Sequence, residues 1–434
     1  MSRARVSSDE GVRLLLGGLK SLLRCDGAEV VEGIARFVMS QHGGLRASSS
    51  LMRRTEGTPL PAAAALLGGL NRFLEVRAGD EGADAVWVAR LGNERRALEA
   101  LPALLPELKW AEWKFRRRPR AEALAALPSF VASASALVRM ARRLQRRHEF
   151  FKVLRAAELV GYYVRYVGLF RRGRYRLALM SSHSNPHGIA FNLAARRCGV
   201  PVVLVTHGMP VRPVARLRFD SSIVHCEAAR RIYAEEGCAL GRVFTHGRRQ
   251  DFAPMPAGPP GGQLSVGIFL CKDVNEGRLR ALVARLLADA RVARVLLRPH
   301  PKNLWRGLGG WVASTGEPRL RLGSGVAVSQ DLEAVDIVLA GNSSVLVDAV
   351  TAGRPAAFVS RLDHAAEDMH AFVREGLIYR LNDAPGIDFD ALLDFYRRPE
   401  WPGVLRLFAN VDEDGRAVFA RFASAVRELV SLKR

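Results

Sequence analysis

The sequence predicts an α/β fold made of two Rossmann-like halves, preceded by a helical N-terminal segment. From residue 176 onward, short apolar runs alternate with segments of helical periodicity, a pattern typical of a parallel sheet covered by helices on both faces. A stretch rich in proline and glycine, residues 251–263, divides this series in two and is the best candidate for a linker. The chain has 434 residues, more than one hydrophobic core usually supports, which agrees with two domains.

Four segments follow from these boundaries. Residues 1–75 are expected to form a helical N-terminal segment, 76–250 the first Rossmann-like domain, 251–263 the linker and 264–434 the second Rossmann-like domain. The expected strands are residues 85–89, 177–180, 201–205, 222–226 and 242–244, then 265–270, 294–298, 319–322, 337–339 and 356–359. Ligands of open α/β sheets bind at the carboxyl ends of the strands, so we expect the ligand in a cleft between the two domains.

The stretch 109–176 has helical spacing and is densely basic, with aromatic and aliphatic side chains between its arginine clusters. Two interpretations stay open. Such a helix can lie in a membrane interface, or it can face a protein core with its basic side solvated. The formal net charge of the whole chain is +22, which favours anionic partners such as lipid headgroups, nucleic acid or acidic substrates.

Cysteine spacing and the N-terminus bear on the cellular compartment. The five cysteines are scattered without a C-x-x-C pair, so neither a disulfide framework nor a zinc site is indicated. No apolar run near the N-terminus is long enough for a signal peptide or a membrane span. We therefore expect a cytoplasmic protein.

The strand at 294–298 runs directly into a polar turn, Arg298-Pro-His300-Pro-Lys302. A guanidinium, an imidazole and an ammonium group at a strand end are suited to pair with phosphoryl oxygens. An ordinary polar turn is the alternative interpretation.

A second polar strand end is Gly341-Asn342-Ser343-Ser344, between the strand at 337–339 and the helix at 345–352. Helix starts offer backbone N–H groups and the positive end of a dipole, and serine hydroxyls add donors. Simple capping by either serine is the alternative, and it is compatible with anion binding. Asp348, one turn into the helix, is a candidate acceptor for ribose hydroxyls.

In the first half, His207 follows the strand at 201–205 and precedes Gly208. A histidine at such a strand end is a candidate general base for an acceptor hydroxyl, or else a structural turn residue. Ser182, His183 and Asn185 follow the strand at 177–180 and are candidates for acceptor binding.

Several enzyme classes lose support because their motifs are missing from the sequence. There is no G-x-G-x-x-G, G-x-x-x-x-G-K-[ST], H-E-x-x-H or G-x-S-x-G in a fitting context, which argues against dehydrogenases, P-loop NTPases, zincins and serine hydrolases. No Asp-x-Asp pair follows a convincing strand either. We therefore expect no metal site and no cofactor.

Across residues 176–380 the pattern resembles the GT-B transferases of bacterial surface polysaccharides. It is similar in particular to the superfamily of CDP-glycerol glycerophosphotransferases, capsule Kdo transferases and bacterial sialyl- and polysialyltransferases. The motifs that carry it are His207-Gly208, Arg298-Pro-His300-Pro, Ser343-Ser344 with an acidic position in the following helix, and Gly353-x-Pro355. The resemblance implies a GT-B fold, two Rossmann-like domains facing a central cleft. It also implies that His300, Ser343 and Ser344 bind donor phosphates and that His207 is a candidate catalytic base.

Two departures limit the resemblance. The acidic Asp/Glu-Asp/Glu-Gly element of the sialyltransferases is not evident in the first half, which argues against CMP-sialic acid. The Glu-rich donor helix of the UDP-N-acetylglucosamine 2-epimerases, which share the fold, is missing as well.

These features together predict a metal-independent glycosyltransferase or related glycerophosphotransferase. It would move a sugar or alditol phosphate from a CMP-, CDP- or UDP-linked donor to a cell-surface or capsular glycan, or to a lipid-linked acceptor, at the anionic inner face of the membrane. The alternative is a basic protein that binds nucleic acid or membranes and keeps a vestigial nucleotide site. No recognised nucleic-acid module is present and aromatic residues make up only 7% of the chain, so we do not expect nucleic acid as a partner.

Overall fold

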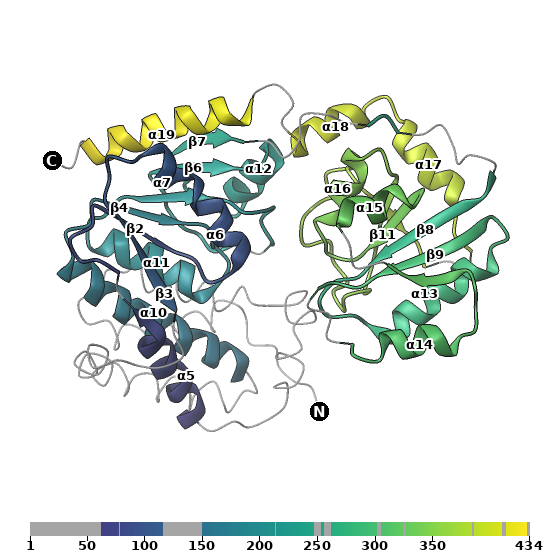
Figure 1. The fold of residues 1–434 in the computed structure, drawn as a ribbon, viewed down its shortest axis with the longest axis horizontal. Helices are drawn as coiled ribbons and strands as arrows, with labels where there is room; N and C mark the ends of the chain where they lie inside the picture. Colours follow the sequence, from purple (N-terminus) through teal and green to yellow (C-terminus); the bar gives the residue numbers. More distant parts are fainter. Residues whose placement is uncertain are drawn as a thin grey trace, which may run out of the picture. The chain divides into compact units, whose positions relative to one another are not determined.

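The computed structural model describes residues 62–77, 79–115, 150–212, 214–246, 253–255, 262–301, 305–323, 327–383, 386–409 and 414–431. The chain forms two compact units. Unit 1 contains the described residues up to His246 together with the C-terminal helix, and unit 2 contains those from Ala253 to Ala409. Each unit is built around one sheet (Figure 1).

The sheet of unit 1 has seven strands in the order β1-β3-β2-β4-β5-β6-β7. They are β1 (Val76–Arg77), β2 (Ala85–Val88), β3 (Trp110–Phe115), β4 (Leu177–Met180), β5 (Val202–Val205), β6 (Ser221–Val224) and β7 (Arg242–Thr245). Only the pair of β1 with β3 is antiparallel among these strands. The central strands β2, β4, β5 and β6 are buried along their whole length, as the continuous apolar runs of β2, β4 and β5 predict.

The described helices of unit 1 are α5 (Ala62–Glu75), α6 (Gly92–Leu98), α7 (Ala100–Leu104), α10 (Phe150–Arg172), α11 (Pro186–Arg197), α12 (Glu227–Glu235) and α19 (Gly415–Ser431). Helix α10 packs against α5 and α11. Its residues Tyr162, Tyr163, Tyr166 and Phe170 are almost completely buried. Of the two interpretations of the basic stretch, the core-facing one therefore holds for this part of α10.

The prediction that residues 109–176 are helical is wrong for Trp110–Phe115, which form the strand β3. Ala111 and Trp113 point into the core and alternate with less buried side chains, which is strand periodicity. The indole of Trp113 packs against the rings of Tyr166 and Phe191. Trp110 and Trp113 lie three residues apart, a spacing that also fits one face of a helix.

The C-terminal helix α19 belongs to unit 1, so the predicted extent of the second domain, 264–434, is too long at its end. Phe422 and Val426 of α19 lie in the same hydrophobic core as Trp87 and Val203. Figure 1 shows α19, in yellow, running beside β6 and β7. Arg427 adds an ion pair with Glu107 at 2.6 Å.

The sheet of unit 2 has six parallel strands in the order β10-β9-β8-β11-β12-β13. They are β8 (Leu264–Phe269), β9 (Val292–Arg298), β10 (Leu320–Leu322), β11 (Ile337–Ala340), β12 (Ala356–Val359) and β13 (Tyr379–Leu381). Numbered along the chain, this is the strand order 3-2-1-4-5-6 of a Rossmann fold. The predicted fold class, α/β with two Rossmann-like domains, is confirmed.

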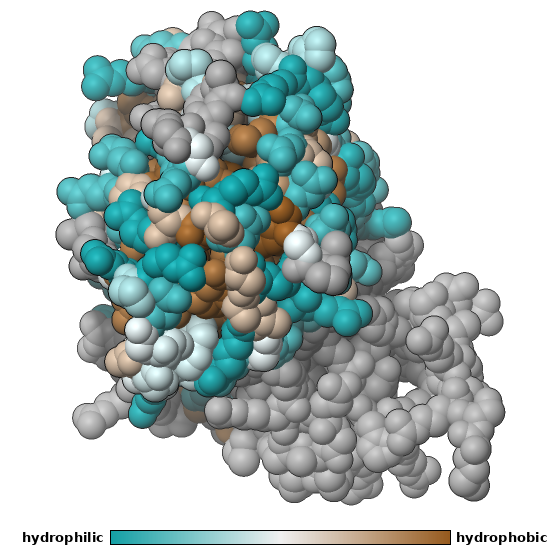
Figure 2. All heavy atoms as spheres, turned by 90° about the vertical axis from the view of Figure 1, so that its right-hand side faces the viewer, coloured by the Kyte–Doolittle hydropathy of each residue, from teal (hydrophilic) through white to brown (hydrophobic). Residues whose placement is uncertain are grey.

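The described helices of unit 2 are α13 (Glu276–Ala288), α14 (Leu308–Ser314), α15 (Val328–Glu333), α16 (Val345–Thr351), α17 (Phe389–Arg397) and α18 (Trp401–Phe408). The elements α14, β13, α17 and α18 were not predicted. Figure 2 shows the side of the molecule that carries α13, α14 and α17 in Figure 1. Hydrophilic side chains cover most of its coloured surface, with small apolar patches between them.

The turn from α16 into β12 explains the Gly353-x-Pro355 motif. Gly353 has a φ of 70°, and a Cβ atom there would lie 2.6 Å from the carbonyl oxygen of Pro254. Both the left-handed backbone and the close approach require glycine.

Among the described helices of the chain, none is long and apolar enough to cross a membrane.

Candidate functional site

In unit 2, the last residue of β9 is Arg298, and its guanidinium forms an ion pair with the carboxylate of Asp331 on α15. The side chains of Arg298 and Asp331 are only 12% and 6% exposed. The pair fixes the guanidinium at the carboxyl end of the strand. Two residues further on, His300 is exposed. Lys302, the third cation predicted here, lies outside the described residues.

The second predicted element, Ser343-Ser344, follows β11 and begins α16. Ser344 is the N-cap, yet its hydroxyl makes no capping hydrogen bond, whereas the Ser343 hydroxyl accepts one from the amide of Val345 at 3.4 Å. The next two amides, of Leu346 and Val347, donate to the carbonyl oxygens of Ser343 and Ser344. The serine hydroxyls, more than the amides of α16, are therefore the donors that this element can offer an anion.

Asp348 lies one turn after Ser344, and its amide donates to the Ser344 carbonyl oxygen at 3.3 Å. Residues four apart occupy the same face of a helix, and both side chains are half-buried. The predicted ribose contact is thus on the same side of α16 as the predicted phosphate contact.

Asn342 differs from the prediction that it binds phosphate, because a neighbouring loop uses its side-chain amide. The amide nitrogen donates to the carbonyl oxygen of Glu367 at 3.0 Å and to a carboxylate oxygen of Asp363 at 3.5 Å. The amide oxygen accepts from the backbone N–H of Met369 at 2.6 Å. Both N–H donors of the amide are engaged, so the side chain holds the loop 360–371 instead of offering donors to a ligand.

The loop 360–371 was not recognised in the sequence, although it directly follows β12 and contacts Asn342 at the end of β11. Arg361, His364 and Ala371 have φ values of 63°, 67° and 61°, and such strained residues concentrate at functional sites. The buried carboxylate of Asp363 accepts hydrogen bonds from the amides of Asn342 and Ala365, at 3.0 and 3.3 Å. An Asp-His pair soon after a buried strand was the available signal.

In unit 1, His207 follows β5, and its Nδ1 atom lies 2.8 Å from the hydroxyl oxygen of Ser181 at the end of β4. The imidazole is half-buried. Burial lowers the pKa of His207 below its usual value, so the ring is uncharged at neutral pH. An uncharged imidazole with one nitrogen held by a hydroxyl has the form that a general base requires.

The predicted acceptor contacts Ser182 and His183 are buried, at 3% and 5% exposure, and make contacts within unit 1. The hydroxyl of Ser182 accepts a hydrogen bond from the amide of Asn185 at 3.0 Å. His183 lies 2.8 Å from the hydroxyl of Tyr233, and burial together with His207 lowers the pKa of His183 to about 3. Both residues support the turn before α11. Asn185, which is half-buried, remains the candidate acceptor contact.

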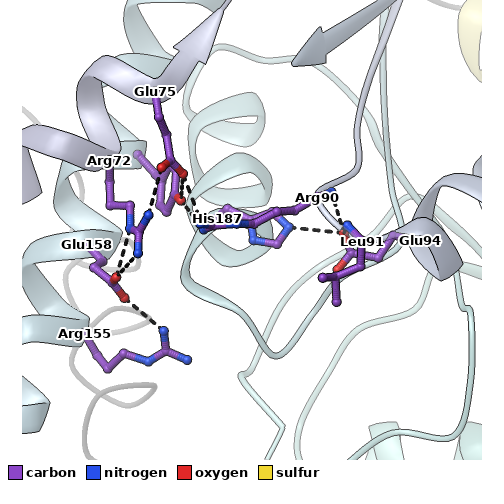
Figure 3. Close-up of polar contacts among 9 residues, drawn as sticks. Arg72, Glu75, Arg90, Leu91, Glu94, Arg155, Glu158 and His187 are labelled. Atoms are coloured by element: carbon purple, nitrogen blue, oxygen red, sulfur yellow. Dashed lines mark hydrogen bonds and ion pairs between the residues drawn. The ribbon is translucent and has the colours of Figure 1, made fainter. Parts of the chain in front are cut away.

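Glu94, which was not recognised in the sequence, lies beside His187 (Figure 3), with Glu94 in the first turn of α6 and His187 at the start of α11. A carboxylate oxygen of Glu94 accepts from the backbone N–H groups of Arg90 and Leu91 at 2.7 and 3.1 Å, and His187 Nε2 lies 3.6 Å away. Burial would raise the pKa of Glu94, but His187 and the two N–H groups outweigh it and hold the pKa at about 2. The only signal in the sequence was a glutamate in the first turn of the helix that follows β2, since the N-cap residue, Leu91, cannot complete a capping box.

Figure 3 also shows how Arg90 is held beside this pair. Its guanidinium donates to the hydroxyl of Tyr162 at 2.5 Å and lies 3.4 Å from the carboxylate of Glu75.

Within the part of the chain that the structure describes, no group of three or more histidine, cysteine or acidic residues is arranged to hold a metal ion.

No family model and no curated protein matches the sequence. Solved structures similar to the chain include the calicheamicin glycosyltransferase, at 14% identity and a TM-score of 0.46, covering 81% of this chain and 98% of that one. The glycosyltransferase of kitacinnamycin matches at 12% identity and a TM-score of 0.45, covering 81% and 100%. The UDP-GlcNAc 2-epimerase of Neisseria meningitidis, bound to UDP-GlcNAc, matches at 11% identity and a TM-score of 0.40, covering 81% and 99%.

The chain is thus an α/β protein of two Rossmann-like units. The solved structures similar to it include glycosyltransferases and UDP-GlcNAc 2-epimerases.

Proposed function

We propose that the chain is a metal-independent glycosyltransferase or related glycerophosphotransferase. It moves a sugar or an alditol phosphate from a CMP-, CDP- or UDP-linked donor to a cell-surface or capsular glycan acceptor. The observation that carries the proposal is the placement of Arg298, His300 and the two serines, Ser343 and Ser344, at the carboxyl ends of β9 and β11, on either side of β8. In open parallel sheets this edge is where ligands bind.

Strand spacing supports binding of one phosphate group or diphosphate by both elements. Neighbouring strands lie about 4.8 Å apart, so the ends of β9 and β11 are about 10 Å apart. The long side chain of Arg298 and the imidazole of His300 approach from β9, and the hydroxyls of Ser343 and Ser344 approach from β11. Together they stabilise the negative charge that develops on the departing phosphate, which is the task of a metal ion in other transferases.

The acceptor side of the reaction is assigned to His207 in unit 1. The imidazole takes the proton of the acceptor hydroxyl, and the hydroxyl oxygen forms the new bond to the anomeric carbon or, in a glycerophosphotransferase, to phosphorus. The bond to the nucleotide phosphate breaks, and the leaving nucleotide keeps the electron pair. His207 suits this step because burial favours its uncharged form.

Titration calorimetry with CMP-, CDP-, UDP- and GDP-linked donors tests the proposal and identifies the base of the donor. We expect His300→Ala and Ser344→Ala to abolish donor binding, whereas Ser314→Ala, an exposed serine of the same unit, leaves it unchanged. His207→Ala is expected to keep donor binding and to stop turnover. Unchanged donor affinity in both His300→Ala and Ser344→Ala would refute the assignment.

The proposal extends to where the enzyme works, at the cytoplasmic face of the inner membrane with a glycan or lipid-linked acceptor. The arginines that would contact anionic lipid, at positions 142, 143, 146 and 147, lie outside the described residues. Liposome binding that requires anionic lipid and is lost when these four are neutralised supports the location. Duplex DNA binding with a steep salt dependence and no nucleotide affinity would favour the alternative of a basic binding protein.

A further inference from the structure

We propose that Glu94 is the buried counter-charge of the histidine site in unit 1, and that it stabilises the imidazolium which forms on His207 during the reaction. Glu94 thereby acts as a positioning residue through electrostatics, without touching the substrate. The inference rests on the proposed role of His207 as the base.

The sheet brings three chain segments to one edge. Strands β2, β4 and β5 are neighbours in the parallel sheet. Glu94 is in the first turn of α6 just after β2, His187 is at the start of α11 just after β4, and His207 follows β5. One strand separates β2 from β5, so the chain segments of Glu94 and His207 are about 10 Å apart at the level of the sheet.

Only one of the two carboxylate oxygens of Glu94 takes part in capping α6. The Oε2 atom accepts both backbone hydrogen bonds, whereas the buried Oε1 atom has no hydrogen-bond partner. The Nε2 atom of His187, on a side chain only 2% exposed, has no hydrogen bond either and lies 3.6 Å from Oε2. A neutral glutamine at this position could accept the same two backbone hydrogen bonds through its side-chain oxygen, so capping of α6 does not by itself require the charge of Glu94.

Among the described residues that act on the His207 ring, Glu94 is the one that carries a negative charge. The others are the hydroxyl of Ser181 from the end of β4 and the imidazoles of His187 and His183. Burial and His187 favour the uncharged ring, whereas Glu94 favours the charged one. When His207 accepts a proton in this buried place, the fixed charge of Glu94 lowers the energy of the imidazolium.

The test is Glu94→Gln, read by NMR titration of the His207 ring in the free protein. Because one oxygen of Glu94 accepts both backbone bonds, the glutamine oxygen can replace it, so the variant removes the charge and keeps the cap. One charge about 10 Å away at an effective dielectric constant of about 20 changes a titration midpoint by about one pH unit. We therefore expect the His207 midpoint to fall by about that much.

Two further variants separate charge from structure. Glu112→Gln removes a mostly buried acid of the same unit that pairs with Arg95, and we expect the His207 midpoint to stay at its wild-type value. Glu94→Asp keeps the charge but shortens the side chain and weakens the cap, so the midpoint should stay near that of the wild type. A wild-type midpoint in Glu94→Gln overturns the inference, and so does an equal fall in Glu94→Asp.

Kinetics connect the inference to the proposed function. Glu94→Gln is expected to lower kcat, to move the acid limb of the pH profile downward and to leave the donor Kd unchanged, since the donor residues are in unit 2. If the chain binds no nucleotide donor and has no turnover, the proposed function fails, while the NMR titration still decides whether Glu94 acts on His207.

Discussion

The ion pair between Arg298 and Asp331 allows stability and donor binding to be separated. Both side chains are largely buried, at 12% and 6% exposure. Removing one partner of a buried pair leaves the other charge poorly compensated and costs about 3–5 kcal/mol. We expect Arg298→Met to lower the unfolding free energy of unit 2 by this amount, so its loss of donor binding alone would not be diagnostic.

Replacing both partners removes this complication. Exchange of a buried ion pair for apolar side chains of similar volume is roughly neutral, within about 1 kcal/mol, or stabilising. The double variant Arg298→Met with Asp331→Leu should therefore have near-wild-type stability and still fail to bind the donor. Hydrogen exchange of the β8, β9 and β11 amides reports the stability of unit 2 separately from that of unit 1, and calorimetry reports donor affinity.

Two results would refute this reasoning. A cost below about 1 kcal/mol in Arg298→Met would mean that the pair is solvated like a surface ion pair. Full donor affinity in the stable double variant would remove Arg298 from the phosphate site, whatever the stabilities are.

Three further predictions concern unit 1. Because burial lowers the pKa of His207, turnover should stay constant through neutral pH and fall as pH drops through that lowered pKa; an acid limb centred above 6.5, measured in a pH–rate profile, would contradict this. The folded-state pKa of Glu94 is about 2, below the ordinary 4.5. Its carboxylate therefore contributes about 3 kcal/mol to the free energy of unfolding above pH 4.5, and this contribution is lost as the pH falls toward 2. Urea unfolding across this pH range should show a weaker pH dependence in Glu94→Gln than in the wild type. Phe422→Ala should cost about 3–5 kcal/mol in urea unfolding, and Phe419→Ala, at a half-buried position of the same helix, clearly less; equal costs would contradict the packing of α19.

Much of the fold could be predicted from local sequence. The continuous apolar runs of β4, β5, β11 and β12 are buried along their whole length, because a central strand covered on both faces needs apolar side chains on both. The polar residues that follow β9, β11 and β5 were identified in the same way, because each marks the point where an apolar strand ends. Within unit 2, parallel pairing brings the residues that follow β9 and β11 to one edge of the same sheet.

Other features depend on contacts between residues far apart in the chain. The segment of β3 is compatible with helix or strand, and its choice depends on pairing with β2 and on the packing of Trp113 against Tyr166. Helix α19 has an ordinary amphipathic pattern, and that pattern does not say which sheet its apolar face will cover.

The sequence by itself determined two α/β units with mostly parallel sheets and the polar residues that follow their strands. Only the tertiary structure decided how these polar side chains are used. It pairs Arg298 with Asp331, commits the amide of Asn342 to the loop 360–371, buries Ser182 and His183, and adds Glu94 beside the histidines. The physical reason is that the availability of a donor, an acceptor or a charge depends on burial and on partners that approach through space, and neither is encoded in the spacing of residues along the chain.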